Sequence, residues 1–298
     1  MPEITRRRTG EILRTLFDML LTSEDGMRAR DAVSATEQRM TLSEYEKGEY
    51  PSGGQRFDKI LRFATVDLVK AGWLLKENGR WSITPEGRLA FEMLTDPADF
   101  YREAVRLYHQ WKAGQPGPVS DEDEEAPQET PGKIATVTFE EAQDQARADI
   151  ETYLATINPY EFQKIVAALL RAMGYYVSWT SPKGKDGGID IVAANDLLAT
   201  HGPRIKVQVK RQSGTQVNAE GLRAFMALLN DGDVGMFVSL GGFSRDAENE
   251  ARKQEKRRVT LVDMNLLMKL WTENYDKLDD EAHRLLPLQR IYFLAPQS

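Results

Sequence analysis

The sequence predicts an α/β protein of two domains, and three patterns in its 298 residues support this prediction. The first third reads as amphipathic helices followed by a short hairpin. The second half alternates strand-like and helix-like segments, which is typical of a mixed sheet with helices on both faces. A stretch rich in proline, glycine and acidic residues separates the two. A chain of this length accommodates roughly two domains of about 100 to 200 residues each.

The composition is that of a protein with hydrophobic cores and no disulfide bonds. Hydrophobic residues make up 41% of the chain, which contains no cysteine and three histidines. These are too few ligands for a structural zinc site. No segment approaches the roughly 18 consecutive apolar residues that a membrane-spanning helix needs. We therefore expect a cytoplasmic protein with no membrane segment and no secretory leader.

The negative charge of the chain is concentrated in one region. The formal net charge at pH 7 is -7. Residues 1–95 hold 15 Lys and Arg against 15 Asp and Glu, residues 96–155 hold 5 against 14, and residues 156–298 hold 19 against 17. Because phosphates bind to a local basic face and not to the summed charge, this distribution leaves nucleic acid open as a partner.

Residues 1–95 have the pattern of a winged helix, in which three helices precede a small hairpin. The last of the three helical patterns has apolar residues at i, i+3, i+4, i+7 and i+11, which predicts one core-facing stripe. These residues are Phe57, Ile60, Leu61, Ala64 and Leu68. Gly72 ends that helix. Residues 73–84 then alternate like a hairpin, with Asn78-Gly79 at the turn.

Three consecutive arginines, Arg6, Arg7 and Arg8, precede the first helical pattern. A flexible basic arm of this kind can lie along phosphates or enter a minor groove. A solvated leader without contact to DNA is the alternative, and we favour it.

Residues 96–135 are predicted to connect the two domains. A helix is expected over 96–111, and the residues after it contain four prolines and an acidic run. Such a composition cannot bury enough apolar surface to offset the entropy of ordering. We interpret the acidic run as a solvated spacer, with occupation of a DNA-binding face as the alternative. The expected domains are therefore 1–95 and 136–298, with a first helix of the second domain over 139–156.

Two strand-like segments in the second domain carry polar side chains near their ends. Side chains at i and i+2 of a strand face the same side, so Gln208 and Lys210 stand together while Val207 and Val209 face the core. Asp190 begins the preceding strand, and an acid at such a position is costly unless a cation meets it. Together these groups offer oxygen ligands for a divalent metal and a positive charge for a phosphate.

Asp190 followed by Gln208-Val209-Lys210 resembles the core of the PD-(D/E)XK nucleases, in the Mrr-like form where Gln replaces the second acid. The resemblance extends through the segments PYEFQKIVAALLRAMGYYV, KDGGIDIVA, VQVKR and GMFVSLGGFSRDAENEA. In the first domain, RFDKIL and KAGWLLKENGRWSITPEGR resemble the Mrr N-terminal domain. The fold implied is α/β, with an N-terminal winged helix and a C-terminal restriction-endonuclease-like domain whose mixed central sheet is flanked by helices.

Two departures from the broad nuclease pattern affect the expected metal site. Ile189 stands where many of these nucleases have proline, and Gln208 is neutral. The site should therefore hold less negative charge, and the number of metal ions is open.

The resemblance implies a catalytic set of Asp190, Gln208, Lys210 and Glu161. Asp190, Gln208 and Glu161 would hold Mg²⁺, or Mn²⁺ in its place. Glu161 also stands at the third position of a helix that Asn158 would cap, so it has a capping-box interpretation. The two roles do not exclude each other.

Further basic residues near this site are expected to contact DNA. Lys183 and Lys185 lie in a glycine-rich loop that lets backbone amides approach a phosphate, and Arg211 follows the Gln-Val-Lys segment. Asp186 in the same loop is interpreted as closing a turn, with a second metal-linked acid as the alternative.

In the winged helix, Arg56, Lys59 and Arg62 are expected on the side that enters the major groove. Lys76 and Arg80 on the hairpin are expected to touch the DNA backbone. One alternative is that these are the charges of an ordinary solvent-exposed helix face. Another is that the domain binds a protein.

The expected function is that of a metal-dependent DNA endonuclease and, by resemblance, of a type IV restriction enzyme that cleaves methylated or otherwise modified duplex DNA. Double-strand cutting calls for two active sites, so the expected assembly is a homodimer or a higher even homo-oligomer. Two alternatives stay open. One is a repair or Holliday-junction nuclease with the same core, and the other is a winged-helix DNA-binding regulator whose nuclease fold is inactive.

Overall fold

The chain folds into two compact units in a computed structural model that describes residues 4–23, 25–50, 54–77, 79–114, 131–182, 184, 187–200, 202–254 and 257–293. The N-terminal unit consists of Met1–Ala146 with Tyr292–Ser298, and the C-terminal unit of Arg147–Ile291. Among the described residues, no helix is both long enough and apolar enough to cross a bilayer. The acidic run of the linker lies outside the described residues.

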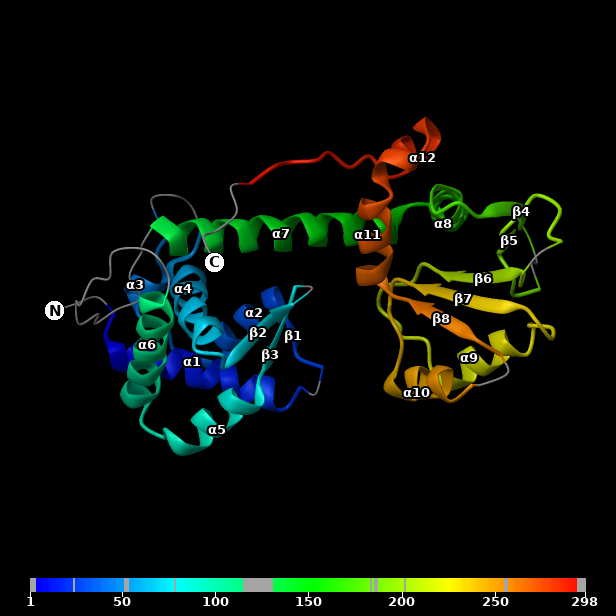
Figure 1. The fold of residues 1–298 in the computed structure, drawn as a ribbon. Coiled ribbons are helices and arrows are strands. Elements are labelled where there is room, and N and C mark those ends of the chain that lie inside the picture. Colours follow the sequence, from blue (N-terminus) through cyan, green and yellow to red (C-terminus); the bar gives the residue numbers. More distant parts are fainter. Residues whose placement is uncertain are drawn as a thin grey trace. The chain divides into compact units, whose positions relative to one another are not determined.

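The N-terminal unit is helical, with one small sheet (Figure 1). Its helices are α1 (Arg6–Leu21), α2 (Ala29–Arg39), α3 (Glu44–Lys47), α4 (Arg56–Lys70), α5 (Pro85–Met93), α6 (Pro97–Ala113) and the first part of α7 (Pro131–Thr156). Its strands are β1 (Met27–Arg28), β2 (Leu74–Glu77) and β3 (Arg80–Ile83), in the sheet order β1-β3-β2. The order of these elements is that of a winged helix, as predicted.

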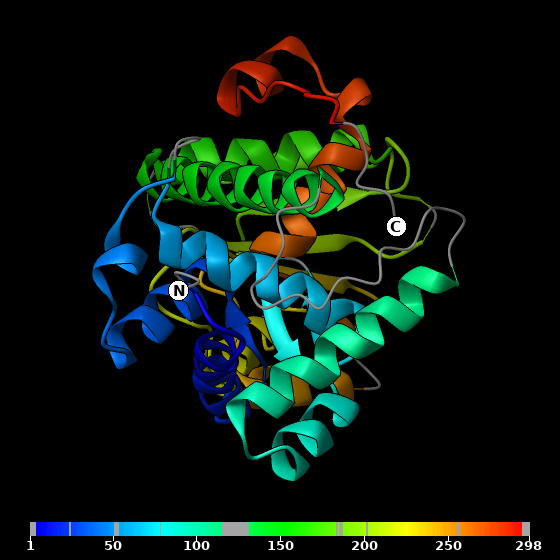
Figure 2. The same cartoon turned by 90° about the vertical axis from the view of Figure 1, so that its left-hand side faces the viewer.

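The predicted helix and hairpin of this unit are confirmed. The five residues of the apolar stripe on α4 are all buried in one core with α1, α2 and α6. Figure 2 shows α4 and α6 along their lengths. Strands β2 and β3 pair antiparallel, and Gly79 at their turn has φ of 70°, which glycine adopts without steric strain. The added strand β1 was not predicted.

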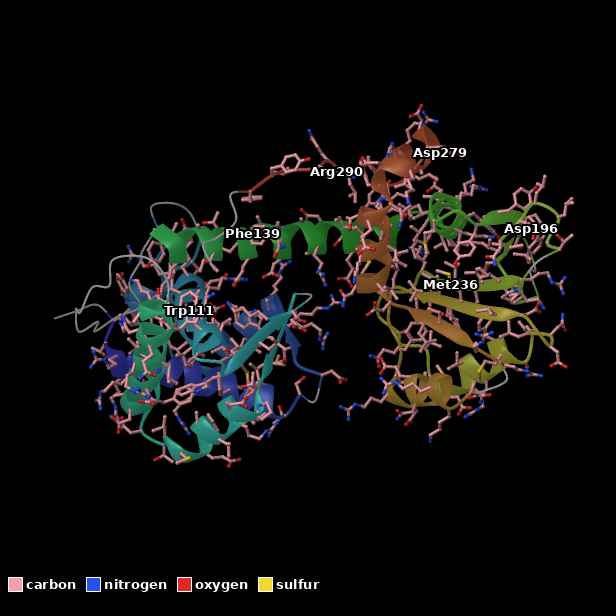
Figure 3. The ribbon with its side chains drawn as sticks, in the orientation of Figure 1. Trp111, Phe139, Asp196, Met236, Asp279 and Arg290 are labelled. Carbon is pink, nitrogen blue, oxygen red and sulfur yellow. The ribbon has the colours of Figure 1, made fainter. Side chains whose placement is uncertain are left out.

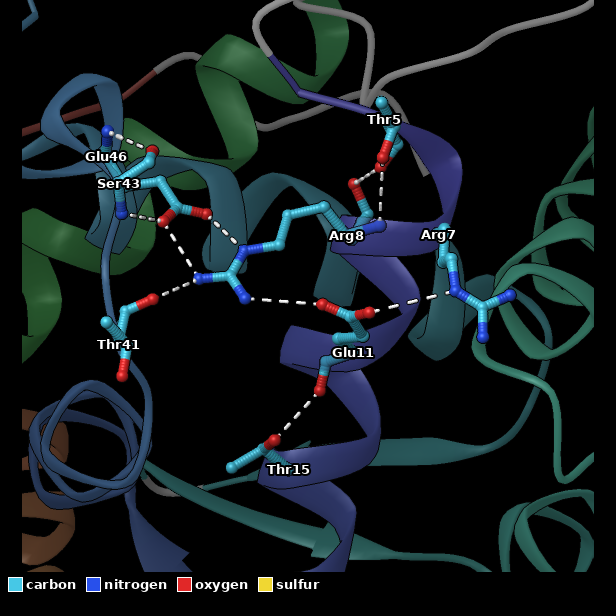
Figure 4. A network of polar contacts seen from close by, with 9 residues as sticks. Thr5, Arg7, Arg8, Glu11, Thr15, Thr41, Ser43 and Glu46 are labelled. Atoms are coloured by element: carbon cyan, nitrogen blue, oxygen red, sulfur yellow. Dashed lines mark hydrogen bonds and ion pairs between the residues drawn. The ribbon is translucent and has the colours of Figure 1, made fainter.

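The three N-terminal arginines form the first turn of α1, so both the arm and the leader interpretations are wrong. The guanidinium of Arg8 pairs with Glu46 on α3 at 2.7 Å (Figure 4). The guanidinium of Arg7 pairs with Asp96 at 2.9 Å. Burial acts to raise the pKa of Glu46, but hydrogen bonds from Arg8 and Ser43 outweigh it and lower the pKa overall. These contacts tie α1 to its own unit.

Helix α7 begins at Pro131, eight residues before the expected start at Phe139. Proline at a first helical position is favourable because its missing N–H is not needed there. Phe139 lies on this helix (Figure 3) and packs edge-on against Phe293, with 5.6 Å between the ring centroids. The boundary between the two units falls within α7, after Ala146.

The C-terminal unit is a five-stranded mixed sheet between helices. The strands are β4 (Tyr176–Thr180), β5 (Ile191–Ala194), β6 (Ile205–Lys210), β7 (Val234–Ser239) and β8 (Val259–Val262), in that order across the sheet. The helices are α8 (Pro159–Ala172), α9 (Ala219–Met226), α10 (Arg245–Lys253), α11 (Met264–Glu273) and α12 (Asp280–Leu285), with a 3₁₀ turn at Tyr275–Lys277. Strand β5 pairs antiparallel with β4 and β6, whereas β6, β7 and β8 are parallel.

The two faces of this sheet have separate cores. One face packs under α8 and the other against α9 and α10 (Figure 1). Val207 belongs to the core under α8, and Phe237 belongs to the core with α9 and α10. Because side chains alternate along a strand, each residue of β6 belongs to one of these faces. The restriction-endonuclease-like plan of a mixed sheet flanked by helices is confirmed.

Candidate functional site

The backbone of Asp190 is fixed by three hydrogen bonds just before β5 begins. Its N–H donates to the carbonyl of Val207 on β6 at 2.8 Å, and its carbonyl accepts from the N–H of Ser181 at 2.8 Å. The same carbonyl accepts from Nε2 of Gln163 on α8 at 2.7 Å. Three different elements therefore set the position of this acid.

The carboxylate of Asp190 lies against strand β6. Its Oδ2 accepts a hydrogen bond from the backbone N–H of Val209 at 2.7 Å. Val209 stands between Gln208 and Lys210 in the chain, so the acid lies at the segment that carries the predicted amide and lysine. A charge-assisted bond of this kind is stronger than a neutral one, and it gives the carboxylate a defined orientation.

Gln208 and Lys210 share one face of β6, as predicted. In the parallel pairing with β7, Gln208 lies opposite Phe237 and Lys210 opposite Ser239. A Cβ built on Gly188 would lie 3.8 Å from Nε2 of Gln208. The amide of Gln208 therefore lies beside the loop that leads into Asp190.

Lys210 is exposed at the end of β6. Its Nζ lies 5.8 Å from the centroid of the Phe237 ring. Within the described part of the chain it forms no ion pair. An ammonium that has no carboxylate partner among the described residues is available to an anion from outside the chain.

Gln163 contributes to this region, and we did not single it out from the sequence. Its side chain is buried, and Nε2 also donates to the carbonyl of Ser181 at 3.3 Å. It thus joins the end of β4 to the residue that precedes β5. The signal was its place three residues before Val166 and seven before Leu170, which puts a polar amide at the edge of the buried stripe of α8.

Glu161 takes the capping role that the sequence left open. Its Oε2 accepts from the backbone N–H of Asn158 at 3.2 Å, and the Asn158 side chain caps the first turn of α8 in return. The capping box is therefore confirmed. A metal-binding role for Glu161 stays a prediction, because the metal would have to draw this carboxylate away from the cap.

The basic residues predicted around the catalytic strands have different outcomes. Lys183, Lys185 and Asp186 lie outside the described residues. Arg211 is half-buried, and its guanidinium donates to the carbonyl of Ala155 in the last turn of α7. The last carbonyls of a helix lack partners within it, so Arg211 caps a helix in this structure. Its contact with DNA stays a prediction.

Two of the basic residues predicted on the winged helix are buried in ion pairs. The side chain of Arg62 is 5% exposed and contacts Asp58 at 2.6 Å and Asp144 at 2.9 Å. The side chain of Lys76 is 11% exposed and contacts Glu140 at 2.7 Å. Carboxylates of α7 already pair with both side chains, and contact of these two residues with DNA stays a prediction.

The other three are partly buried. Arg56 donates to the carbonyl of Tyr45 at 3.4 Å and stacks over its ring. Arg80 donates to the carbonyls of residues 25 and 26 at 3.0 and 2.7 Å. Lys59 lies over the ring of Tyr50 with 5.6 Å to its centroid. Contact of these residues with DNA stays a prediction.

The donors around Asp190 fit a hard divalent cation. The carboxylate and the Gln208 amide supply oxygens, which such cations prefer, and Mg²⁺ usually takes only one or two carboxylates together with waters and substrate phosphate. Across the residues that the structure describes, no group of three or more His, Cys, Asp or Glu side chains gathers in one place. A cation held by Asp190 and Gln208 would have coordination positions left for water and phosphate.

Comparison with known families matches both parts of the chain. Residues 154–271, which contain Asp190 and β6, match a family model described as a restriction endonuclease. Residues 10–92, which contain the winged helix, match the model of the Mrr N-terminal domain.

Two known proteins are similar to this chain. The chain is 26% identical over 296 residues to the type IV methyl-directed restriction enzyme EcoKMrr of Escherichia coli (strain K12), covering 92% of this chain and 94% of that protein. A solved structure of the MspJI restriction endonuclease in complex with a 27-mer oligonucleotide matches with a TM-score of 0.32 and 19% identity. That match covers 65% of this chain and 48% of the other, and it supports no functional conclusion.

The fold and the two family matches define a restriction endonuclease with a separate N-terminal domain. Within that class the chain belongs to the Mrr family.

Proposed function

We propose that this protein is a metal-dependent endodeoxyribonuclease that cleaves methylated or otherwise modified duplex DNA by phosphodiester hydrolysis. The observation that carries the proposal is the hydrogen bond between the Asp190 carboxylate and Val209, which holds the acid at the Gln208–Lys210 segment of an Mrr-family domain. The E. coli relative is described as methyl-directed, which supports modified DNA as the substrate class.

Each residue of the site has a distinct proposed role. Asp190 and the side-chain carbonyl of Gln208 would hold Mg²⁺, or Mn²⁺ in its place, with Glu161 as a further candidate. When bound, such a cation polarises the scissile phosphate and supplies a nucleophilic hydroxide near neutral pH.

Lys210 provides positive charge toward the phosphate. Negative charge grows on the phosphate oxygens as water attacks, and a cation already in place stabilises it without reorganisation. The exposed ammonium has no ion pair to break within the described residues, so it is available for this role. Asp190 keeps its orientation because its backbone is held by β4, β6 and α8.

The proposed assembly is a homodimer or a higher even homo-oligomer. A single site cuts one strand, and two copies can cut both strands of a duplex within one binding event. Mass measurement in solution, with and without DNA, tests this point, and a protein that stays monomeric in both conditions would contradict it.

The experiment that tests the proposed function uses two supercoiled plasmids of the same sequence, one methylated and one unmodified. Each is incubated with the wild-type chain in Mg²⁺, in Mn²⁺ and in EDTA. We expect nicked and linear products from the methylated plasmid alone, and only when a divalent cation is present.

Each part of the proposal can fail separately in that experiment. Cleavage that persists in EDTA would show that the reaction does not require a divalent metal. Equal cleavage of both plasmids would remove the modified substrate class. Faster cutting of a four-way junction than of the methylated duplex would favour a structure-specific nuclease.

A further inference from the structure

One stripe of α7 covers α4 and β2 of the N-terminal unit. Lys133, Val137, Glu140 and Asp144 recur at i, i+4, i+7 and i+11 on this helix, so they lie along one side of it. We call these four residues the α7 stripe. A helix that packs permanently on a domain normally does so with an apolar stripe. Three of the four residues in the α7 stripe are charged.

Two acids of the α7 stripe meet the two buried cations described above. Oδ2 of Asp144 lies 2.9 Å from Nη1 of Arg62 on α4, and Oε2 of Glu140 lies 2.7 Å from Nζ of Lys76 on β2. Helix α4, the last helix before the hairpin, and the β2–β3 hairpin are the elements that a winged helix presents to the groove and backbone of DNA. The α7 acids therefore pair with cations on the two elements that such a domain presents to DNA.

The other two residues of the α7 stripe also contact the N-terminal unit. Val137 joins Phe63 and Val66 of α4 in one small buried cluster. Lys133 pairs with Asp67 of α4 at 2.6 Å. In this pair the cation lies on α7 and the acid on α4, the reverse of the pair between Asp144 and Arg62. Among the described residues, this part of α7 is held by one small apolar cluster, by the Lys133 ammonium over the Tyr108 ring at 4.6 Å and by ion pairs.

Ion pairs of this kind add little net stability because removing both charges from water offsets their attraction. Burial lowers the pKa of Lys76 even with Glu140 beside it, which indicates that desolvation outweighs the attraction of the pair. A dense polyanion, which gains from the release of its counterions on binding, can therefore replace the two acids.

We propose that this face of α4 and β2 is a site for the phosphate backbone of duplex DNA, and that the α7 stripe occupies it in the protein without DNA. DNA and α7 then compete for Arg62 and Lys76. The inference rests on the proposed function, because it takes duplex DNA as the partner, and it adds a site and a competitor within the chain.

The first test removes the competing charges and keeps the side-chain shapes. The full-length Glu140→Gln/Asp144→Asn variant and the wild type are titrated against a labelled methylated duplex in EDTA, where no cleavage interferes. We expect the Kd of the variant to fall on the order of tenfold, within the usual range of coupling between two ligands.

A matched control makes the same change of net charge on a neighbouring helix. Asp99→Asn/Glu103→Gln on α6 removes two acids that pair with Arg102 and Arg106 at the surface of the same unit. Because exposed charges at a distance are screened by salt, this variant should bind nearly as the wild type does. An equal gain in both variants would mean a general charge effect and would overturn the proposal.

The site itself is tested by adding Arg62→Gln to the Glu140→Gln/Asp144→Asn variant. If Arg62 contacts phosphate after α7 has left, the triple variant loses the gain in affinity. If the triple variant binds as tightly as the double variant, Arg62 is not part of the DNA site and the proposal fails.

An engineered disulfide between α4 and α7 gives an independent and reversible test. The chain has no cysteine of its own, so no native thiol interferes. Val66→Cys/Val137→Cys places two thiols in the buried cluster between α4 and α7. Oxidation should hold the α7 stripe in place and weaken binding of the duplex, and reduction should restore it in the same sample. Equal binding by the oxidised and reduced forms would overturn the competition.

These outcomes separate the two proposals. If no form binds or cuts DNA, the proposed function fails. If the protein cuts methylated DNA and neither the α7 variants nor the engineered disulfide change its affinity, only the competition fails.

Discussion

The basic side chains that were expected to meet DNA are held in opposite ways in the two units. On α4 and β2, Arg62 and Lys76 are buried against carboxylates of α7. On β6, Lys210 is exposed and has no ion pair within the described residues. Among the described residues, Lys210 of the C-terminal unit is thus available to an anion from outside the chain. In the N-terminal unit, Arg62 and Lys76 already pair with carboxylates of the same chain.

The same contrast exists within strand β6. Lys206 lies four residues before Lys210 and therefore on the same face. Its Nζ pairs with the buried carboxylate of Asp233 at 2.9 Å and donates to the carbonyl of Leu228 at 2.8 Å. The position of a lysine on a strand thus determines the face on which it lies. The neighbouring elements determine whether it already has an ion-pair partner.

The largest effect is expected at the buried pair between α4 and α7. The side chains of Lys133 and Asp67 are 2% and 0% exposed. Lys133→Met should destabilise the N-terminal unit by about 3–5 kcal/mol, because it leaves a buried carboxylate without its cation. Denaturant unfolding measures this, and Lys133→Met/Asp67→Asn should recover most of the loss. A single variant as stable as the double variant would contradict the account.

The pH dependence of the Lys133→Met variant follows from Asp67. Burial raises the pKa of Asp67, and loss of the lysine raises it further. A carboxyl whose pKa is higher in the folded state stabilises the fold below its unfolded pKa, and that contribution is lost as the pH rises through the folded pKa. The variant should therefore regain stability as the pH is lowered from neutral toward about 4. A deficit that does not change with pH would argue against a buried charge.

The next largest effect is expected at the open lysine. Lys210→Ala should slow DNA cleavage by about a hundredfold to a thousandfold, the usual loss when one stabilising donor is removed from a developing anion. Duplex binding should change little. Lys269→Ala, which removes an exposed lysine from α11, is the control and should cut normally. Undiminished nicking by Lys210→Ala would remove this residue from the mechanism.

A smaller effect is expected at Gln163. Gln163→Leu removes the donor to the carbonyls of Ser181 and Asp190, so unfolding measurements should show a loss of about 1 kcal/mol. Cleavage should fall while duplex affinity is retained, because Asp190 would be less firmly positioned. Lys164→Ala, on the exposed side of the same helix, is the matched control. Equal cleavage by both variants would mean that Gln163 is structural only.

An effect on stability alone, and so the smallest overall, is expected at Asp233. Burial acts to raise its pKa, but hydrogen bonds from Lys206 and from the backbone of Asn230 outweigh it, and the net shift is downward. A lowered pKa gives stability above the unfolded value of about 3.9 that is lost as the pH falls through the folded pKa. Asp233→Asn should lose about 1 kcal/mol at neutral pH, and less in acid. Urea unfolding at several pH values measures this, and a constant difference would contradict it.

The sequence could predict features that depend on local periodicity. The alternation of residues 205–210 placed Gln208 and Lys210 on one face, and their pairing with β7 agrees. Proline, asparagine and glutamate at the start of α8 predicted its cap. In these cases the local chain alone determines the outcome.

Features that depend on distant segments could not be predicted in this way. Arg62 lies outside the apolar stripe of α4 and Lys76 is a charged residue of the hairpin, so the sequence favours solvent exposure for both. The elements that cover them come more than 60 residues later, on α7. The partner of Arg211 likewise lies 56 residues away. Periodicity shows which face is polar, and it does not show what meets that face.

The most direct test of the hydrolytic site is single-turnover cleavage of a methylated plasmid by the wild type, Asp190→Asn and the exposed control Asp231→Asn. Asparagine keeps the size of the side chain and an oxygen that can accept from Val209, but it removes the negative charge. We predict that Asp190→Asn binds the plasmid and cuts it at least about a hundredfold more slowly, while Asp231→Asn cuts at the wild-type rate. Cleavage by Asp190→Asn at the wild-type rate would contradict the account.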